Sequence, residues 1–201
     1  MSTTTTTTTL PPEFQDNLES IRIMGFWVFL TTDLVLFGSL FAVYVVFRSR
    51  VGLGPTPHQL FSMGPVLTET LILLTSSFTC SLSLYSARKN RVKGAISWLV
   101  VTLALGMSFV LLEIREFTTD VLNGHTWHQS AFLSGFFTLV GTHGSHVTVG
   151  IGWAIMLAIQ LGMKGLTLTT RRKLYAFALY WHFLDIVWIF LFTVVYLSGI
   201  A

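Results

Sequence analysis

Charged residues are scarce in this chain. Asp, Glu, Lys and Arg make up 10% of its 201 residues, whereas 52% are hydrophobic. A soluble domain usually carries about 25% charged residues, so this composition excludes an ordinary soluble domain. It indicates a membrane protein instead. The 17 Phe and 6 Trp fit the lipid-facing and interfacial surfaces of such a protein.

Cysteine and the common enzyme motifs are also nearly absent. The one cysteine, Cys80, excludes a disulfide within the chain. It lies in an apolar segment, so we interpret it as a small packing residue without chemistry of its own. The sequence has no Gly-x-Ser-x-Gly, no His-Glu-x-x-His and no phosphate-cradling glycine loop. These absences give little support to a nucleophilic enzyme, a zinc protease or a nucleotide-binding protein.

Five long apolar segments account for most of the chain. Residues 1–20 include seven consecutive threonines, and we expect them to form a flexible polar arm. Residues 21–201 are predicted to be a single transmembrane domain. Its spans are expected at about 24–47, 66–87, 94–117, 131–161 and 175–199, and each segment is long enough to cross a bilayer. The sequence therefore predicts an all-α polytopic membrane protein, a bundle of five transmembrane helices.

The basic residues predict the orientation of these helices. With five spans the two termini lie on opposite sides, and the loops on the amino-terminal side carry nine Lys and Arg residues. The other side carries only Arg48 and Arg50. Short loops rich in Lys and Arg stay in the cytoplasm, so we expect a cytoplasmic amino terminus and an external carboxyl terminus. The excess of positive charge is a topology signal, and we predict no nucleic-acid partner.

Ionisable residues within the spans form two groups. His143 and His146 lie three residues apart in the fourth segment, so they project from one helical face. His182 and Asp185 repeat this spacing in the fifth segment, and the helical rise brings these four residues and Asp33 to a central polar layer. Such residues can ligate a haem or metal, carry protons or bind substrate, or hydrogen-bond between helices. The last role is common in membrane bundles.

The second group lies near the outer ends of the second and third segments. It consists of Glu69, Glu113, Arg115 and Glu116. Long charged side chains near a helix end reach headgroups or water. We therefore expect this outer group to be solvated.

Two longer motifs resemble signatures of subunit III of the haem-copper terminal oxidases. The segment Gly141–Val147 (GTHGSHV) is similar to the His-Gly-x-His-Val signature of that family. The segment Trp181–Trp188 (WHFLDIVW) is similar to its Trp-His-Phe-x-Asp-x-Val-Trp signature. Glu116 lies where the family has a glutamate at the end of the corresponding helix, and Asp33 lies where many members have an intramembrane glutamate. The resemblance extends from about Ile21 to the end of the chain.

The resemblance implies a function for the whole complex. Five spans, where cytochrome c oxidase members have seven, match the shorter form typical of bacterial quinol oxidases. The chain is then expected to be the non-catalytic subunit III of a proton-pumping quinol oxidase in the bacterial cytoplasmic membrane. It supports assembly, stability and sustained proton uptake of subunit I. The resemblance implies that the chain itself binds no cofactor, and that haem and copper belong to subunit I, which would oxidise quinol and reduce oxygen. Subunits I and II, a small subunit IV and membrane phospholipids are the implied partners.

The resemblance also suggests roles for individual residues. His143 and His146 are expected to bond across to Asp185 or to backbone carbonyls of the fifth helix, with His182 completing this network. Asp33 is expected near a lipid site or the contact with subunit I. Glu116 is expected to anchor the outer end of the third helix.

Three other functions remain as alternatives. One is subunit III of a cytochrome c oxidase, since no residue here excludes cytochrome c as the electron donor. The second is a small membrane cytochrome with haem on His143, His146 or His182. The third is a proton-linked transporter that uses Asp33 and Asp185, although no inverted repeat of the kind common in transporters is visible.

Overall fold

The structure confirms the all-α fold with five membrane-spanning helices. The computed structural model describes residues 12–47, 63–122 and 131–197. Within these ranges it contains no strand, and five helices are long and apolar enough to cross a membrane. The helices are α1 (Pro12–Phe47), α3 (Met63–Arg88), α4 (Val92–Leu122), α5 (Ala131–Lys164) and α6 (Leu168–Leu191). A short π-helix, η1 (Phe192–Leu197), follows α6 directly.

Each helix extends beyond its predicted apolar segment at one end or at both. Residues 12–20, expected in the flexible arm, are the first turns of α1, which begins at a proline that has no backbone N–H to leave unpaired. Residues 1–11 lie outside the described residues. The fifth helix begins at Leu168, seven residues before the predicted start at 175. Thr167 caps it, because its side-chain oxygen accepts a hydrogen bond from the Thr170 backbone N–H at 3.2 Å.

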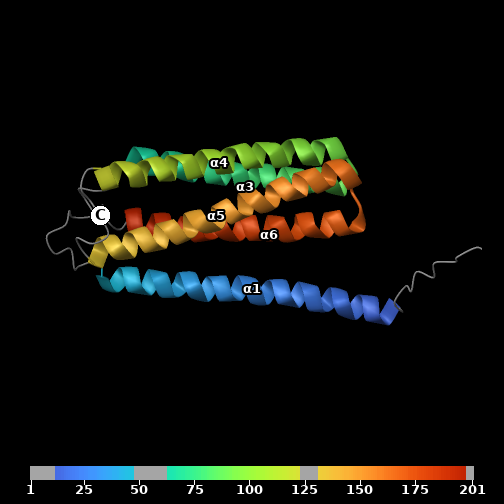
Figure 1. Ribbon diagram of the computed structural model, residues 1–201, viewed down its shortest axis with the longest axis horizontal. Coiled ribbons are helices and arrows are strands. Elements are labelled where there is room, and N and C mark those ends of the chain that lie inside the picture. Colours follow the sequence, from blue (N-terminus) through green and yellow to red (C-terminus); the bar gives the residue numbers. More distant parts are fainter. Residues whose placement is uncertain (1–11, 48–62, 123–130, 198–201) are drawn as a thin grey trace, which may run out of the picture. The chain divides into compact units, whose positions relative to one another are not determined.

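The chain divides into two compact units, residues 1–36 and residues 37–201. In the first unit, threonine hydroxyls bond back to the carbonyls of their own helix, as Thr31 does to Trp27 at 2.9 Å. In the second unit, α3 packs against α4 and α6, and α5 packs against the same two helices. These four helices run side by side along their lengths, and each contacts two others (Figure 1). They enclose the core that holds most of the polar residues of interest.

The core of this second unit is aromatic and tightly packed. Phe109, Tyr180 and Trp188 are each at most 2% exposed. Glycine makes room for a large side chain in this core: a Cβ on Gly106 of α4 would lie 2.8 Å from the indole of Trp181, which reaches across from α6. A larger residue at position 106 would displace the indole from the centre of the bundle.

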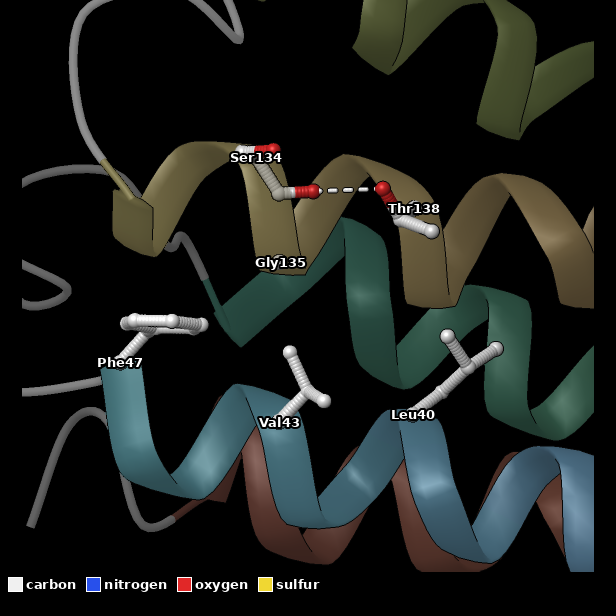
Figure 2. Close-up of a pocket in the computed structure, with 6 residues that line it drawn as sticks. All are labelled: Leu40, Val43, Phe47, Ser134, Gly135 and Thr138. Carbon is white, nitrogen blue, oxygen red and sulfur yellow. Dashed lines mark hydrogen bonds between the residues drawn. The ribbon is translucent and has the colours of Figure 1, made fainter.

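A pocket lies between the end of α1 and the beginning of α5, both in the second unit. Its volume is about 290 Å³. Figure 2 shows Leu40, Val43 and Phe47 of α1 facing Ser134, Gly135 and Thr138 of α5. The Thr138 hydroxyl donates to the Ser134 carbonyl at 2.7 Å, so it is satisfied within its own helix. No ionisable side chain lines this pocket, so none of the ionisable residues discussed next belongs to it.

Candidate functional site

His143 lies in an aromatic enclosure made of Phe37, Phe109 and Trp188. Its side chain is fully buried, and its ring centroid lies 5.2 Å from that of Trp188, 6.0 Å from Phe109 and 6.3 Å from Phe37. Neither ring nitrogen has a hydrogen-bond partner among the described residues. The prediction that this imidazole bonds to α6 is therefore wrong, because α6 presents the indole of Trp188 to it.

His146 connects to α6 through its backbone. Its Nδ1 lies 2.8 Å from the Thr142 carbonyl one turn earlier in α5, and since a carbonyl only accepts, this nitrogen carries the proton. The Tyr180 hydroxyl of α6 donates to the backbone carbonyl of His146 at 3.0 Å. A bond between α5 and α6 therefore exists here, and the tyrosine of α6 makes it to the backbone of α5.

His182 and Asp185 face α3, whereas we expected them to face α5. The Ser77 hydroxyl lies 2.6 Å from Nδ1 of His182, and the Ser81 hydroxyl lies 3.2 Å from its Nε2. Ser77 also hydrogen-bonds the carboxyl of Asp185, whose Oδ1 is buried without a partner in the described ranges. We call Ser77, Ser81, His182 and Asp185 the serine cluster. It corrects the predicted His–Asp network between α5 and α6.

Two tryptophans extend this contact between α6 and α3. The indole N–H of Trp181 donates to the Ser76 hydroxyl at 3.0 Å, and that of Trp188 donates to the Thr70 hydroxyl at 3.1 Å. The hydroxyl residues of α3 were not among the predicted site residues. The signal that identifies them is their number in one apolar segment, because a hydroxyl in lipid needs a partner. Sequence reasoning gave weight to the ionisable residues and missed their partners.

Glu69 and Glu113 lie inside the bundle, not at a solvated end. Their side chains are only 1% and 5% exposed, which corrects the expectation that they reach water or headgroups. The physical reason is helix length: α4 continues to Leu122, so Glu113 lies more than two turns from its end. Glu69 Oε2 and Glu113 Oε1 have no hydrogen-bond partner among the described residues.

These two glutamates belong to an acidic group with Glu116. The three carboxyls lie close enough for like-charge repulsion, while Glu116 itself is half-buried and Arg115 is exposed. The Glu113 carboxyl packs directly on α5, where a Cβ on Gly144 would lie 2.8 Å from its Cδ. No three His, Cys, Asp or Glu side chains in the described ranges are placed to hold a metal ion together.

Asp33 lies on α1 in the first unit. Its predicted role at a lipid site or subunit contact stays a prediction. The same is true of the predicted anchoring role of Glu116.

These features define a class of protein. It is a polytopic membrane protein in which tryptophan, tyrosine and serine side chains join neighbouring spans through hydrogen bonds. The family model for cytochrome c oxidase subunit III matches residues 12–200, and the chain belongs to that family.

Relatives from several bacteria match nearly the whole chain. Quinol oxidase subunit 3 of Bacillus spizizenii is 47% identical over 191 residues, covering 95% of this chain and 94% of that protein. Cytochrome bo(3) ubiquinol oxidase subunit 3 of Pseudomonas aeruginosa is 48% identical, covering 88% and 85% of the two chains. Cytochrome c oxidase subunit 3 of Bacillus sp. strain PS3 is 44% identical, covering 94% and 92%.

Proposed function

We propose that this chain is subunit III of a proton-translocating quinol oxidase and has no catalytic centre of its own. The observation that carries this proposal is the 47% identity to a quinol oxidase subunit 3 over nearly the full length of both chains. Subunit I of the complex would hold the haem and copper, oxidise quinol and reduce oxygen to water. Subunit II and a small subunit IV would complete the assembly.

The contacts of the histidines support a structural role. His143 is packed on three sides by aromatic rings, and both ring nitrogens of His182 meet serine hydroxyls. A haem ligand needs a ring nitrogen that points at the iron; serine hydroxyls occupy both nitrogens of His182, and aromatic rings surround His143. We therefore propose that the histidines hold the helices in register, which sustains the assembly, stability and proton uptake of subunit I.

Location and orientation follow from the same proposal. The chain would lie in the bacterial cytoplasmic membrane with its amino terminus in the cytoplasm. The basic α3–α4 and α5–α6 turns lie at the same end of the four-helix bundle, as the positive-inside rule requires (Figure 1). Reporter fusions at the carboxyl terminus test this orientation: a reporter active only outside the cytoplasm should be active there.

Purification from native membranes tests the function. A tag on this chain should bring down a large haem-bearing subunit in mild detergent, with a reduced-minus-oxidised haem spectrum. When harsher detergent separates this chain from the large subunit, the haem spectrum should be found with the large subunit and not with this chain. A chain that purifies alone and coloured would make the histidines haem ligands. A chain that purifies alone and colourless would favour a transporter, to be tested by flux in liposomes.

Cytochrome c oxidase subunit III is the second candidate, because the Bacillus sp. strain PS3 relative has that name. The two candidates differ in the electron donor of the complex. The purified complex should consume oxygen with a reduced quinol and without cytochrome c. Oxygen consumption with reduced cytochrome c alone would favour the second candidate.

A further inference from the structure

Glu69 and Glu113 form a buried pair of carboxyl groups at the end of the bundle where α3 begins and α4 ends (Figure 1). Glu69 lies less than two turns after Gly64, the first residue of the α3 span, and Glu113 lies less than two turns before Thr119, the last residue of the α4 span. A rise of 1.5 Å per residue therefore places both at a depth of about 8 to 9 Å. The two carboxyls share one level of the membrane and repel each other electrostatically.

No cation among the described residues offsets this pair. The other group whose charge acts on both carboxyls is Glu116, which is also an acid. Arg115, the neighbouring basic residue on α4, is exposed. On α5 the ionisable neighbour is His143, whose ring nitrogens bond nothing in the described ranges. Residues 186–197 of α6 and η1 contain no Asp, Glu, Lys, Arg or His. The helices around the pair therefore supply no compensating charge.

The surrounding helices also supply no hydrogen-bond donor to two of the carboxyl oxygens. Glu69 Oε2 and Glu113 Oε1 are buried and accept no hydrogen bond within the described ranges. The Thr70 hydroxyl beside Glu69 accepts from the Trp188 indole and donates to a carbonyl of its own helix. On the α5 side, Gly144 makes room for the acid, because a Cβ there would lie 2.8 Å from Glu113 Oε1. The bundle accommodates the carboxyls by shape and does not stabilise a negative charge on them.

A carboxyl in this setting is far more stable with its proton than without it. An ionised carboxylate within a membrane is costly unless a cation or hydrogen-bond donors compensate it. A second carboxylate nearby adds repulsion, so two interacting acids do not readily ionise together. Protonation removes both costs at once. We propose that Glu69 and Glu113 form a proton-binding site, in which at least one of the two carboxyls is a neutral carboxylic acid at pH 7.

Glu116 connects this site to the nearer membrane surface. It is half-buried, follows Glu113 by three residues on the same helical face, and lies less than one turn from Thr119 at the end of the span. In the opposite direction, Phe109 lies one turn before Glu113 and packs edge-on against Trp188, with ring centroids 4.7 Å apart. The site is therefore open toward the surface and closed by aromatic rings toward the middle of the bundle. It binds a proton but does not conduct it across the membrane.

Infrared spectroscopy of the protein, purified with the subunits that accompany it, tests the site. A neutral carboxylic acid has a C=O stretching band that a carboxylate lacks, and this band shifts when deuterium replaces the proton. A solvent-exposed glutamate, with a pKa of about 4.3, is ionised at pH 7 and does not contribute. We expect the double variant Glu69→Gln, Glu113→Gln to lose the band area of at least one carboxyl relative to wild type. An unchanged band area would overturn the proposal.

Stability and a restored acid separate a bound proton from a bound cation. Glutamine has the shape of a neutral glutamic acid, so each single Gln variant should keep a thermal midpoint close to that of wild type. Midpoints that fall and depend on added Na⁺ or K⁺ would show ionised carboxylates around a metal cation, which contradicts the proposal. The variant Glu69→Gln, Glu113→Asp restores one carboxyl and should regain part of the lost band. A band that does not return would likewise refute the site.

Glu116→Gln tests the connection to the surface. The area of the carboxyl band should stay unchanged, but its shift after transfer to D₂O should become several-fold slower. Arg115→Gln changes the adjacent, exposed residue of α4 and is the matched control, with area and rate expected at wild-type values. Equal rates in the two variants would refute the role of Glu116. A loss of band area in Glu116→Gln would place the bound proton on Glu116 and refute the site at the buried pair.

Discussion

His143 and His182 are the same residue type in similar sequence settings, yet they differ in burial and in hydrogen bonding. Each follows an apolar run and begins an i, i+3 pair, one with His146 and the other with Asp185. His143 is fully buried among three aromatic rings, without a hydrogen-bond partner in the described part of the chain. His182 is half-buried, and both of its nitrogens meet serine hydroxyls.

The difference shows that the partner helix decides what an intramembrane histidine does. His143 meets faces of α4 and α6 that carry Phe109 and Trp188, so only ring packing is available to it. His182 meets a face of α3 that carries serines, so it can satisfy both nitrogens. The enclosure and the serine cluster should therefore respond differently to the same substitution.

Gly144→Ala should have the largest effect, because it adds a methyl group beside the enclosure and against the carboxyl of Glu113, which is itself buried. The new Cβ would lie 2.8 Å from the Glu113 Cδ, and forcing extra volume into a packed core costs about 1–3 kcal/mol. The thermal midpoint of the purified complex in detergent measures this loss. Gly152→Ala on the same helix is the matched control, since nothing lies within 4 Å of its added Cβ. Equal midpoints for the two variants would contradict the packing described here.

His182→Leu should destabilise the complex next most strongly. It leaves the hydroxyls of half-buried Ser77 and exposed Ser81 without the imidazole that bonds them. An unsatisfied polar group costs about 1–3 kcal/mol when it is fully buried. The expected loss lies at the lower end of this range, because each serine can also bond within α3, as Ser81 does to the Ser77 carbonyl at 3.2 Å. A thermal midpoint equal to that of wild type would show that the serine cluster does not stabilise the complex.

Ser77→Ala should have a smaller effect of the same kind. It removes the 2.6 Å contact to His182 and the bond to Asp185 but leaves Ser81 in place. Hydrogen bonds between membrane helices average about 0.6 kcal/mol each, so we expect a loss below about 1 kcal/mol, less than that for His182→Leu. The double variant Ser77→Ala, His182→Leu measures the coupling: strictly additive losses would mean that the two side chains do not interact.

His143→Leu should have the smallest effect. Replacing a buried polar group that has no partner by an apolar group of similar size is nearly neutral. We therefore expect the thermal midpoint to change by less than half the change seen for His182→Leu. A loss as large as that of His182→Leu would mean that His143 makes a polar contact in the assembled complex, and the contrast between the two histidines would fail.

Several parts of this picture followed from the sequence alone. The low charge and five apolar segments predicted five membrane-spanning helices, because a long apolar run can only satisfy its backbone in lipid as a helix. The motifs Gly141–Val147 and Trp181–Trp188 were sufficient to indicate the subunit III family. The positions of His143 and His182 inside apolar segments also predicted that these two residues are buried or half-buried.

The tertiary structure alone decided which helices the polar residues meet. Spacing along a helix shows which side chains share a face, but it carries no information on the neighbour that the face contacts. For this reason the expected bonds from His143 to Asp185 were wrong, and the bonds of Asp185 and His182 to α3 were missed. The burial of Glu69 and Glu113 was missed as well, because it depends on helix ends that extend beyond the apolar runs. The sequence by itself determined how many times the chain crosses the membrane, because the number of spans is set by the length of each local apolar segment. The packing of α3, α4 and α6 decided the environment of each polar group, because partners in a bundle come from distant parts of the chain.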